Sequence, residues 1–395
     1  MPFVTQAKGV SWMSGMQVEL VQGRLGIQIV GSPLSRIESA GDEFLNWLRE
    51  LGIDQHVEIG VDRTTGPLIA QFQLRPDSAE QLAPGYDTTQ ICQNLHLDTQ
   101  NHSKDLLKEI LLAMLISPIP FQFPSFAELF ASVRMRQRIV EGARKTALAF
   151  ATSEAERPDD YWSYTEEQGF VVLPGKSLIE ALRKATQPEH SGALYSFSCY
   201  RATEYVIALA MAQEAEACHP ELLEKLQRQA EMRAIKSGEF HQVFCCEYGS
   251  RANPLPLRYF VPGDRTWFRN PDSHSSDASG YEGSWVFYLG DCLFTNFWKR
   301  GRTFSLTSKC LEIYHWRDGT YRDSQGDLRM DESIVEAQVE ATQRDPEKVK
   351  QILERMQRLY DPAGVYAEGG CIDISREYPR WICRGTTDII LPDVP

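Results

Sequence analysis

Hydrophobic and polar residues alternate in several short stretches near the start of the chain, and this period of two is typical of half-buried strands. The four stretches are residues 16–22, 24–30, 56–62 and 67–74. Between the second and the third, residues 35–51 carry apolar side chains at helical spacing and predict an amphipathic helix. This order of elements predicts a small α+β domain over residues 1–80.

The region that follows changes from polar to strongly apolar. Residues 76–103 are rich in polar and turn-forming residues and predict a linker, and residues 103–117 predict a helix with Ser103 as its N-cap. We therefore assign residues 81–116 to a linker and a helix. A long helix is expected over residues 124–150, because apolar side chains return there at helical spacing.

Two apolar stretches in the second half of the chain, residues 257–268 and 283–297, predict strands. The polar, glycine-containing segment between them, residues 269–282, is expected to be a mobile loop. A later helix is expected to begin at Asp345 and Pro346. The resulting boundaries are 117–330 for a main domain and 331–395 for a C-terminal helix and tail.

The composition excludes several classes of function. Lysine and arginine number 41, whereas aspartate and glutamate number 54, so the net charge is −13 and nucleic-acid binding is not expected. The longest apolar stretch carries charges and prolines and is too short to span a membrane. The N-terminus lacks the basic and apolar segments of an export signal, so we expect a cytoplasmic protein without membrane contact.

The nine cysteines include no C-x-x-C pair, and their odd number without an export signal predicts reduced thiols rather than disulfides. The one close Cys/His pair, Cys218 and His219, is too little for a zinc site, so no metal is expected. Neither G-x-G-x-x-G after a strand nor G-x-x-x-x-G-K-[ST] is present, so no cofactor is expected.

One cysteine lies where a helix is expected to begin, in the stretch YSFSCYRAT of residues 195–203. Apolar side chains at helical spacing follow Cys199, and Ser198 is placed to cap this helix. Free backbone N–H groups and the helix dipole stabilise a thiolate at such a position, and the same groups can stabilise an oxyanion. The sequence therefore predicts a nucleophile at Cys199, with a small buried residue as the alternative.

Further motifs accompany this helix in a fixed order. PFQFPSFAELF and YWSYTEEQGFVVLPGKSLIEAL precede it, and FVPGDRTWFRNP and YEGSWVFYLGD follow it. In order and spacing, these motifs resemble the Tgl-type bacterial protein-glutamine gamma-glutamyltransferases over roughly half of the chain. The cysteine helix, the P-G-D strand and the strand ending in L-G are also similar to NlpC-type, papain-like cysteine peptidases. The resemblance implies an α+β fold in which a cysteine-headed helix faces an antiparallel sheet, with an extra N-terminal α+β domain.

The resemblance also implies a reaction. The thiolate of Cys199 would attack a glutamine carboxamide, release ammonia and form a thioester, which a lysine amine would resolve to an isopeptide crosslink. The implied partners are proteins that carry glutamine and lysine side chains. Three aromatic residues, Trp267, Phe268 and Trp285, are expected to line the substrate path and limit water, with packing in the core as the alternative.

The sequence departs from the family at two acid–base positions. The family has a glutamate directly before the nucleophile, where this chain has Ser198. The family has a second glutamate on the later strand, where this chain has Ser284. A serine hydroxyl cannot act as a base near neutral pH, so Ser284 is no direct substitute.

Relocation of the carboxylate is the first explanation. Glu282 lies two residues from Ser284, and on a regular strand both side chains leave the same face. Three other residues are weaker candidates. Glu204 is turned away along the helix, Asp291 is explained as a turn-former, and His274 as a solvated loop residue.

Two further explanations remain open. The helix end and Arg201 could hold Cys199 ionised, with Asn296 or Ser284 only as orienting groups. Alternatively, activity has been lost and the fold serves as a binding or scaffold protein, and a cysteine amidase or deamidase would share all of these residues. If the site is active, we expect Cys199 to be the most acidic of the nine thiols and Glu282→Gln to reduce activity severely.

Overall fold

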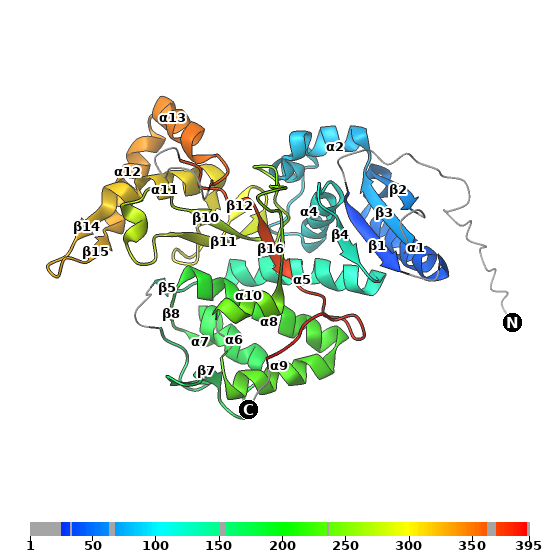
Figure 1. Cartoon of the computed structure of the whole chain (residues 1–395), viewed down its shortest axis with the longest axis horizontal. Helices are drawn as coiled ribbons and strands as arrows, with labels where there is room; N and C mark the ends of the chain where they lie inside the picture. Colours follow the sequence, from blue (N-terminus) through cyan, green and yellow to red (C-terminus); the bar gives the residue numbers. More distant parts are fainter. Residues whose placement is uncertain are drawn as a thin grey trace.

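The structure, a computed structural model, describes residues 25–31, 34–62, 68–150, 155–234, 237–361 and 369–392. Helices and sheets are mixed along the chain, which confirms the expected α+β class. In Figure 1, a small sheet with its helices (blue) lies beside one end of the long helix α5. Two groups of helices, α8–α10 and α11–α13, lie on opposite sides of a second, larger sheet (Figure 1).

The N-terminal sheet has the strand order β2–β3–β1–β4. Its elements are β1 (Ile27–Gly31), α1 (Leu34–Leu51), η1 (Asp54–His56), β2 (Val57–Asp62), β3 (Leu68–Leu74) and β4 (Phe121–Phe123). These match the expected helix and three of the expected strands, whereas the fourth, at 16–22, lies outside the described residues. Strand β4 pairs parallel with β1, so this sheet takes one strand from beyond residue 117.

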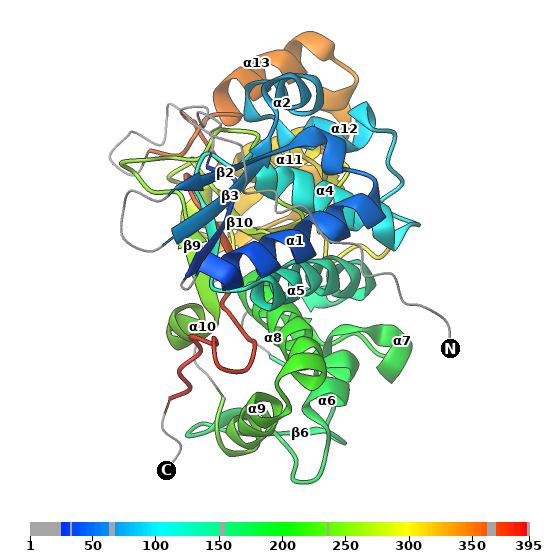
Figure 2. The ribbon, with the colours of Figure 1, turned by 90° about the vertical axis from the view of Figure 1, so that its right-hand side faces the viewer.

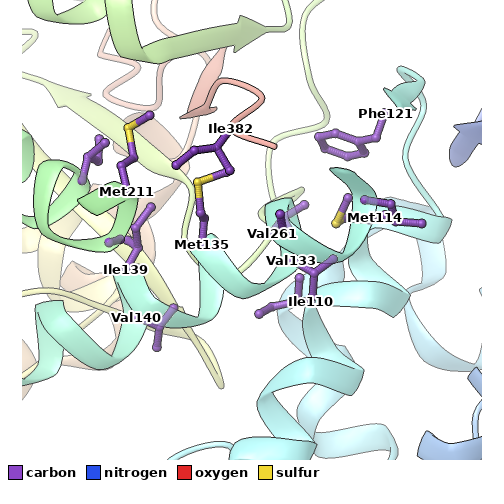
Figure 3. Close-up of a cluster of buried hydrophobic side chains, with 14 of the residues drawn as sticks. Ile110, Met114, Phe121, Val133, Met135, Ile139, Val140, Met211, Val261 and Ile382 are labelled. Carbon is purple, nitrogen blue, oxygen red and sulfur yellow. The ribbon is translucent and has the colours of Figure 1, made fainter. Parts of the chain in front are cut away.

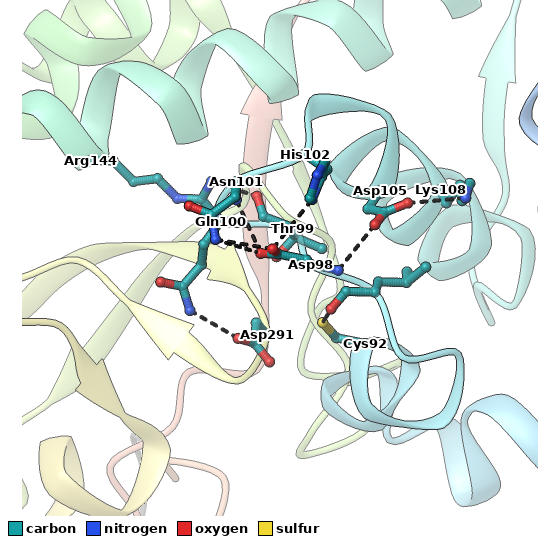
Figure 4. Close-up of polar contacts among 11 residues, drawn as sticks. Cys92, Asp98, Thr99, Gln100, Asn101, His102, Asp105, Lys108, Arg144 and Asp291 are labelled. Atoms are coloured by element: carbon teal, nitrogen blue, oxygen red, sulfur yellow. Dashed lines mark hydrogen bonds and ion pairs between the residues drawn. The ribbon is translucent and has the colours of Figure 1, made fainter.

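The segment expected to be a linker is folded against the larger sheet. It forms α2 (Pro76–Leu82), η2 (Pro84–Tyr86), η3 (Thr88–Gln90) and α3 (Ile91–Asn94). Thr88 is fully buried and its Oγ1 donates to the carbonyl of Phe260 at 2.6 Å. Gln100 Nε2 donates to Asp291 Oδ2 at 3.0 Å (Figure 4). The linker expectation was wrong because these polar side chains bond to protein groups rather than to water.

Two helices follow this segment, α4 (Ser103–Leu115) and α5 (Phe126–Lys145). The expected cap of α4 was wrong: His102 holds the N-cap position and Ser103 is already helical, because a turn at Asp98 fixes the preceding residues. Ser125 caps α5, where its Oγ accepts the N–H of Glu128 at 3.2 Å. Figure 3 shows α5 at the centre of the largest core, which includes Ile110, Met114, Phe121, Val133, Met135, Ile139, Val140, Met211, Val261 and Ile382.

The larger sheet has the order β13–β12–β11–β10–β16–β9. Its strands are β9 (Cys245–Tyr248), β10 (Arg265–Arg269), β11 (Gly283–Gly290), β12 (Leu293–Phe294), β13 (Phe304–Ser305) and β16 (Arg376–Pro379). The strand expected at 257–268 begins only at Arg265, because Gly263 adopts a φ of +89° in the preceding turn. The tail of the chain also supplies a strand, β16, which pairs with both β10 and β9.

The two faces of this sheet bury different cores. Phe287 and Leu289 of β11 belong to the core that contains α5 and α8, whereas Val286 and Tyr288 belong to the core that contains α11. This alternation is that of a strand with both faces covered. The second core holds α11 (Leu306–Gly319), α12 (Glu332–Gln343) and α13 (Pro346–Met356), and a hairpin of β14 (Thr320–Arg322) and β15 (Leu328–Met330) joins the first two. The expected start of α13 is confirmed, since Asp345 caps it.

A layer of helices covers the other face. It consists of α6 (Leu178–Thr186), α7 (Pro188–Ser191), α8 (Cys199–Cys218), α9 (Pro220–Met232) and α10 (Ser237–Phe244). Two short pairs complete it, β5 (Ala149–Phe150) with β8 (Ser196–Phe197), and β6 (Trp162–Thr165) with β7 (Gly169–Val172). Figure 2 shows α8 running under α5, with α6 and α9 on its far side. The β5–β8 pair brings Phe150 next to the start of α8.

Candidate active site

Helix α8 begins at Cys199, as the sequence predicts. Ser198 is its N-cap, and its Oγ accepts the N–H of Arg201 at 3.3 Å. The capping hydroxyl fixes the first turn, so the half-buried Cys199 is held at the helix N-terminus. The same turn leaves backbone N–H groups without helical partners around the thiol.

Strands β10 and β11 form the wall opposite this helix end. They pair antiparallel, so that Trp267 lies opposite Trp285 and Phe268 lies opposite Ser284. The two tryptophan rings are stacked with their centroids 5.2 Å apart and an interplanar angle of 13°. The ring of Tyr200, next to the cysteine, meets Trp285 edge-on at 5.4 Å.

A cavity opens at the thiol of Cys199. Its walls come from the helix start, from β5, from β10 and β11, and from the loop before β11. The lining residues are Phe150, Ser198, Cys199, Tyr200, Trp267, Ser279, Gly280, Glu282, Gly283 and Trp285. The loop expected to be mobile is anchored: buried Asn270 donates from Nδ2 to the Ser275 hydroxyl at 3.0 Å and to the carbonyl of Tyr281 at 2.9 Å.

The surroundings of the Cys199 thiol have opposing effects on its pKa. Burial raises the pKa of Cys199, and this is the largest effect. Hydrogen bonds from the backbone N–H groups of Trp285 and Tyr200 lower the pKa, and so do the positive charges of Lys309 and Arg265. The cysteine therefore lies among donors and cations that favour its thiolate, in a setting whose desolvation disfavours it.

The expected ranking of the thiols was wrong. Burial leaves the pKa of Cys199 above its ordinary value. A hydrogen bond with Cys383 lowers the pKa of Cys218 at the other end of the same helix. Desolvation at the helix start outweighs the helix-end effect on which the expectation rested.

Only some of the expected site residues meet at this cavity. Glu282 lines it with an exposed side chain, and its Oε1 accepts the N–H of Gly280 at 3.4 Å. Ser284 is buried opposite Phe268, and within the described part of the chain its hydroxyl makes no hydrogen bond to Cys199. Asn296 lies away from the lining, where its Oδ1 accepts the N–H of Trp298 at 3.2 Å.

The aromatic residues divide between the two faces of the sheet. Trp267 and Trp285 line the cavity at Cys199. Phe268 does not: it is 0% exposed, on the opposite face, and packs edge-on against Phe294 at 5.3 Å. Alternation along β10 explains the difference, because neighbouring residues of a strand leave opposite faces.

The weaker candidates have structural roles. Glu204 is buried and pairs with Arg201 at 2.7 Å, so this arginine is engaged along the helix. Asp291 lies in the turn after β11 with a φ of +51°, as a turn-former would. His274 lies at the N-cap of the short helix η4 (Ser275–Asp277).

Sequence reasoning missed a charged group behind the aromatic wall. Arg265 is 1% exposed and its guanidinium lies 4.2 Å from the Trp285 ring and 4.3 Å from the Tyr200 ring. Its Nη1 lies 2.8 Å from Glu377 Oε2, and the other oxygen of Glu377 lies 3.1 Å from His241 Nδ1. Arg265 directly follows the Gly-Asp pair of the FVPGDRTWFRNP motif, so only its charge within an apolar strand could have singled it out.

Comparison with known proteins identifies the family. The sequence profile of the protein-glutamine gamma-glutamyltransferases (TGL) matches residues 86–365. The chain belongs to this family. Helices α1 and α2 and strands β1–β3 precede the matched region.

Two members illustrate the extent of the similarity. The protein-glutamine gamma-glutamyltransferase of Halalkalibacterium halodurans is 26% identical over 203 residues, which are 47% of this chain and 62% of that protein. The chain therefore spans less than two thirds of that relative's length. The transglutaminase from Geobacillus stearothermophilus, solved without its C-terminal extension, matches 54% of this chain and 98% of its own, with 19% identity and a TM-score of 0.38.

Among the described residues of this chain, no helix combines the length and the apolar character needed to cross a membrane. No group of three or more His, Cys, Asp or Glu side chains in the described ranges could hold a metal ion.

Proposed function

We propose that this chain is a protein-glutamine gamma-glutamyltransferase with Cys199 as its nucleophile. The sulfur forms a bond to the carboxamide carbon of a protein glutamine, the C–N bond breaks, and the thiol proton leaves with ammonia. A lysine amine then attacks the thioester, and departure of the sulfur leaves an isopeptide bond. The observation that carries the proposal is the thiol at a helix N-terminus, beside two backbone N–H donors and open to an aromatic-walled cavity.

The two backbone donors give the acyl-transfer step its electrostatic support. The N–H groups of Tyr200 and Trp285 belong to rigid elements, a helix start and a strand, and both point at the sulfur. They stabilise negative charge on the thiolate, and after attack they lie close to the oxygen of the tetrahedral intermediate. Preorganised donors of this kind cost no reorganisation during the reaction.

We assign proton transfer to Glu282. Among the described residues that line the cavity, it supplies the carboxylate, and it lies in the loop directly before β11. Ser198 and Ser284, at the two family positions, have a helix-capping role and a buried strand position instead. A carboxylate at the rim can take the thiol proton and later accept the proton of the incoming amine.

The aromatic wall favours a lysine amine over water. Trp267 and Trp285 form a continuous apolar face beside the sulfur, and the aliphatic stem of a lysine side chain can pack along such a surface. A thioester that reacts with water instead would make the protein a glutaminase-type deamidase with the same residues. Access of water therefore decides between transfer and hydrolysis.

Dye incorporation tests the proposal directly. The full chain is incubated with casein as the glutamine protein and a fluorescent primary amine, and protein-bound dye and released ammonia are both measured. We expect incorporation by the unaltered chain, none by Cys199→Ala, and a loss of about 10²-fold or more in Glu282→Gln. Cys246→Ala and Asp277→Asn are the matched controls, since neither residue lines the cavity.

Each alternative has its own result. Ammonia release without dye incorporation identifies a deamidase. Neither product from the unaltered chain, across several glutamine proteins, contradicts the proposal and leaves a binding or scaffold protein. Full activity of Glu282→Gln would show that Glu282 is not the base. It would not affect the assignment of Cys199 as the nucleophile.

The finer architecture is part of the same proposal. The cysteine-headed helix α8 against the antiparallel strands β10 and β11 supports a papain-like plan of the NlpC type. Strands β1–β3 precede the family match and support an additional N-terminal unit. The boundaries 1–80, 81–116, 117–330 and 331–395 stay predictions, because β4 and β16 both join sheets across them.

A further inference from the structure

A second cavity lies directly behind the aromatic wall of the first. The two share Tyr200, Trp267 and Trp285, and the second is lined in addition by charged side chains. Those charged residues are His241, Glu247, Arg265, Arg269, Asp373, Arg376 and Glu377. The rings that face the Cys199 cavity on one side therefore face a charge network on the other.

Within this network, Arg265 is the group that contacts two rings of the wall, those of Tyr200 and Trp285. Its guanidinium packs against both the Tyr200 and the Trp285 rings, at 4.3 Å and 4.2 Å from their centres. Tyr200 is the residue next to Cys199 in the chain, and Trp285 is the residue whose N–H bonds to the thiol. A cation held at this distance from aromatic faces is attracted to them and fixes their orientation.

Two contacts fix the guanidinium, and a third contact holds its carboxylate partner. Its Nε donates to Thr203 Oγ1 at 2.8 Å, which ties it to the second turn of α8. Its Nη1 donates to Glu377 Oε2 at 2.8 Å, and His241 Nδ1 lies 3.1 Å from Glu377 Oε1. One buried ion pair thus connects four elements, namely α8, β10, β16 and α10.

We propose that Arg265 is the positioning residue of this site: it fixes Trp285 and Tyr200 around Cys199 and places a positive charge behind these two residues. This rests on the proposed function, because it explains what orients the groups around the thiol that Glu282 deprotonates. The positive charge of Lys309 on α11 opposes the effect of burial on the pKa of Cys199, and that of Arg265 adds a smaller effect in the same direction. Lys309 pairs with Glu312 at 2.5 Å, whereas Arg265 pairs with Glu377, which also contacts His241.

Two variants with opposite expected effects test the proposal. The rate of Cys199 alkylation by dilute iodoacetamide is measured against pH by peptide mapping, with no substrate present. Arg265→Met removes the cation, so the midpoint of the alkylation profile is expected to rise by about 1 pH unit or more. Glu377→Gln leaves the cation without its counter-charge, so the midpoint is expected to fall. Arg265→Lys keeps a charge and is expected to restore part of the shift.

Arg269→Met is the matched control. Arg269 lies on the same strand, 3.8 Å from the Trp267 ring, and pairs with Asp373 at 2.9 Å. It is expected to leave the Cys199 midpoint unchanged. If only packing were lost, the alkylation midpoint would shift in the same direction in Arg265→Met and Glu377→Gln, and this result would overturn the proposal. An unchanged midpoint in Arg265→Met would also overturn it. If Arg265→Met does not fold, the midpoint of Glu377→Gln tests the proposal: a fall supports it and a rise overturns it.

This outcome can be separated from a failure of the proposed function. Alkylation needs no substrate, so an unaltered chain without transfer activity could still show the opposite shifts. If dye incorporation occurs, the acid limb of its rate against pH is expected to move with the alkylation midpoint in each variant. If the chain transfers the amine but its pH profile is unchanged in the Arg265 variants, Cys199 remains the proposed nucleophile. The positioning role of Arg265 would then be contradicted.

Discussion

The indole of Trp267 occupies the space where a side chain at Gly283 would stand. A Cβ at position 283 would lie 2.1 Å from Trp267 Nε1 and 2.6 Å from the carbonyl oxygen of Phe268. Glycine is therefore required here by close approach rather than by its backbone angles. It lets the indole lie flat beside β11 and so completes the stacked pair that walls the cavity.

Gly283→Ala is expected to displace this indole. Overpacking of a well-filled site costs about 1–3 kcal/mol, so the free energy of unfolding should fall by that amount. Dye incorporation should fall by about 10-fold, because the wall beside the thiol moves. Gly238→Ala is the control, since a Cβ there meets open space. Equal effects of the two substitutions on transfer would contradict the role of the close approach.

Trp267→Ala is expected to change the partition between lysine and water. Removing the ring opens the cavity next to Cys199 and removes the surface that a lysine stem would contact. The ratio of dye incorporated to ammonia released should fall several-fold, while Trp267→Phe keeps most of the ratio. An unchanged ratio in Trp267→Ala would show that this ring takes no part in excluding water.

Alkylation of the free protein is expected to begin at Cys218 rather than at Cys199. Cys218 is half-buried and its pKa is lowered by its hydrogen bond with Cys383, whereas burial raises the pKa of Cys199. A short pulse of dilute iodoacetamide at pH 7.5, followed by peptide mapping, measures the order. Cys383→Ala removes the hydrogen bond and should slow labelling of Cys218. Faster labelling of Cys199 than of Cys218 would contradict the conclusion that burial outweighs the donors and cations around Cys199.

The elements that the sequence predicted well are those fixed by neighbours in the chain. The start of α8 follows from Ser198 and the apolar spacing behind it, and the start of α13 follows from Asp345 and Pro346. Capping bonds join residues only three positions apart, so the local sequence contains all the information they need. The nucleophile position could be named for the same reason.

The parts that sequence could not supply depend on distant partners. Glu377 lies 112 positions from Arg265, on a strand in a stretch that was expected to be a tail. The segment around Thr88 was expected to be a linker because it is polar. Its hydrogen-bond partner, the carbonyl of Phe260, lies 172 positions away, so the local sequence does not reveal it. Composition alone shows polar residues in both cases, and only the fold decides whether protein or water satisfies them.

A fully buried ion pair joins helix α5 to the turn before β10. Arg136 Nη1 lies 2.7 Å from Asp264 Oδ1, and both side chains are 0% exposed. Asp264 Oδ2 also accepts the N–H of Val261 at 2.7 Å and the hydroxyl of Tyr248. Asp264→Asn leaves a buried guanidinium without its counter-charge, so a loss of about 3–5 kcal/mol in the free energy of unfolding is expected.

Urea unfolding measures this loss, with Asp323→Asn as the matched control. Asp323 pairs with Arg329 at 2.9 Å in the β14–β15 hairpin, where the arginine is 53% exposed. Solvent screens an exposed pair, so its loss should change the free energy of unfolding far less. Similar losses in the two variants would mean that burial does not govern the contribution of the Asp264 pair.

Glu109 is expected to make the stability of the protein depend on pH near neutrality. Its carboxyl is fully buried, and this burial raises its pKa to about 7, although the N–H of Asp291 and the hydroxyl of Tyr288 donate to it at 3.0 and 3.2 Å. Between the unfolded pKa of about 4.3 and this value, the folded state holds a proton that the unfolded state has released. The free energy of unfolding should therefore fall as pH rises through this window, by about 4 kcal/mol in total at pH 8.

Glu109→Gln removes the titration while keeping an acceptor for the N–H of Asp291. Its free energy of unfolding is measured by urea at pH 5 and pH 8. Between these pH values it should fall less than that of the unaltered protein, by about 2–3 kcal/mol. Relative to the unaltered chain, the variant is expected to gain stability towards pH 8. Glu141→Gln on α5, where the half-buried carboxylate bonds to Gln137, is the control and should leave the slope unchanged. An identical slope in Glu109→Gln and the unaltered chain would assign the pH dependence to other groups.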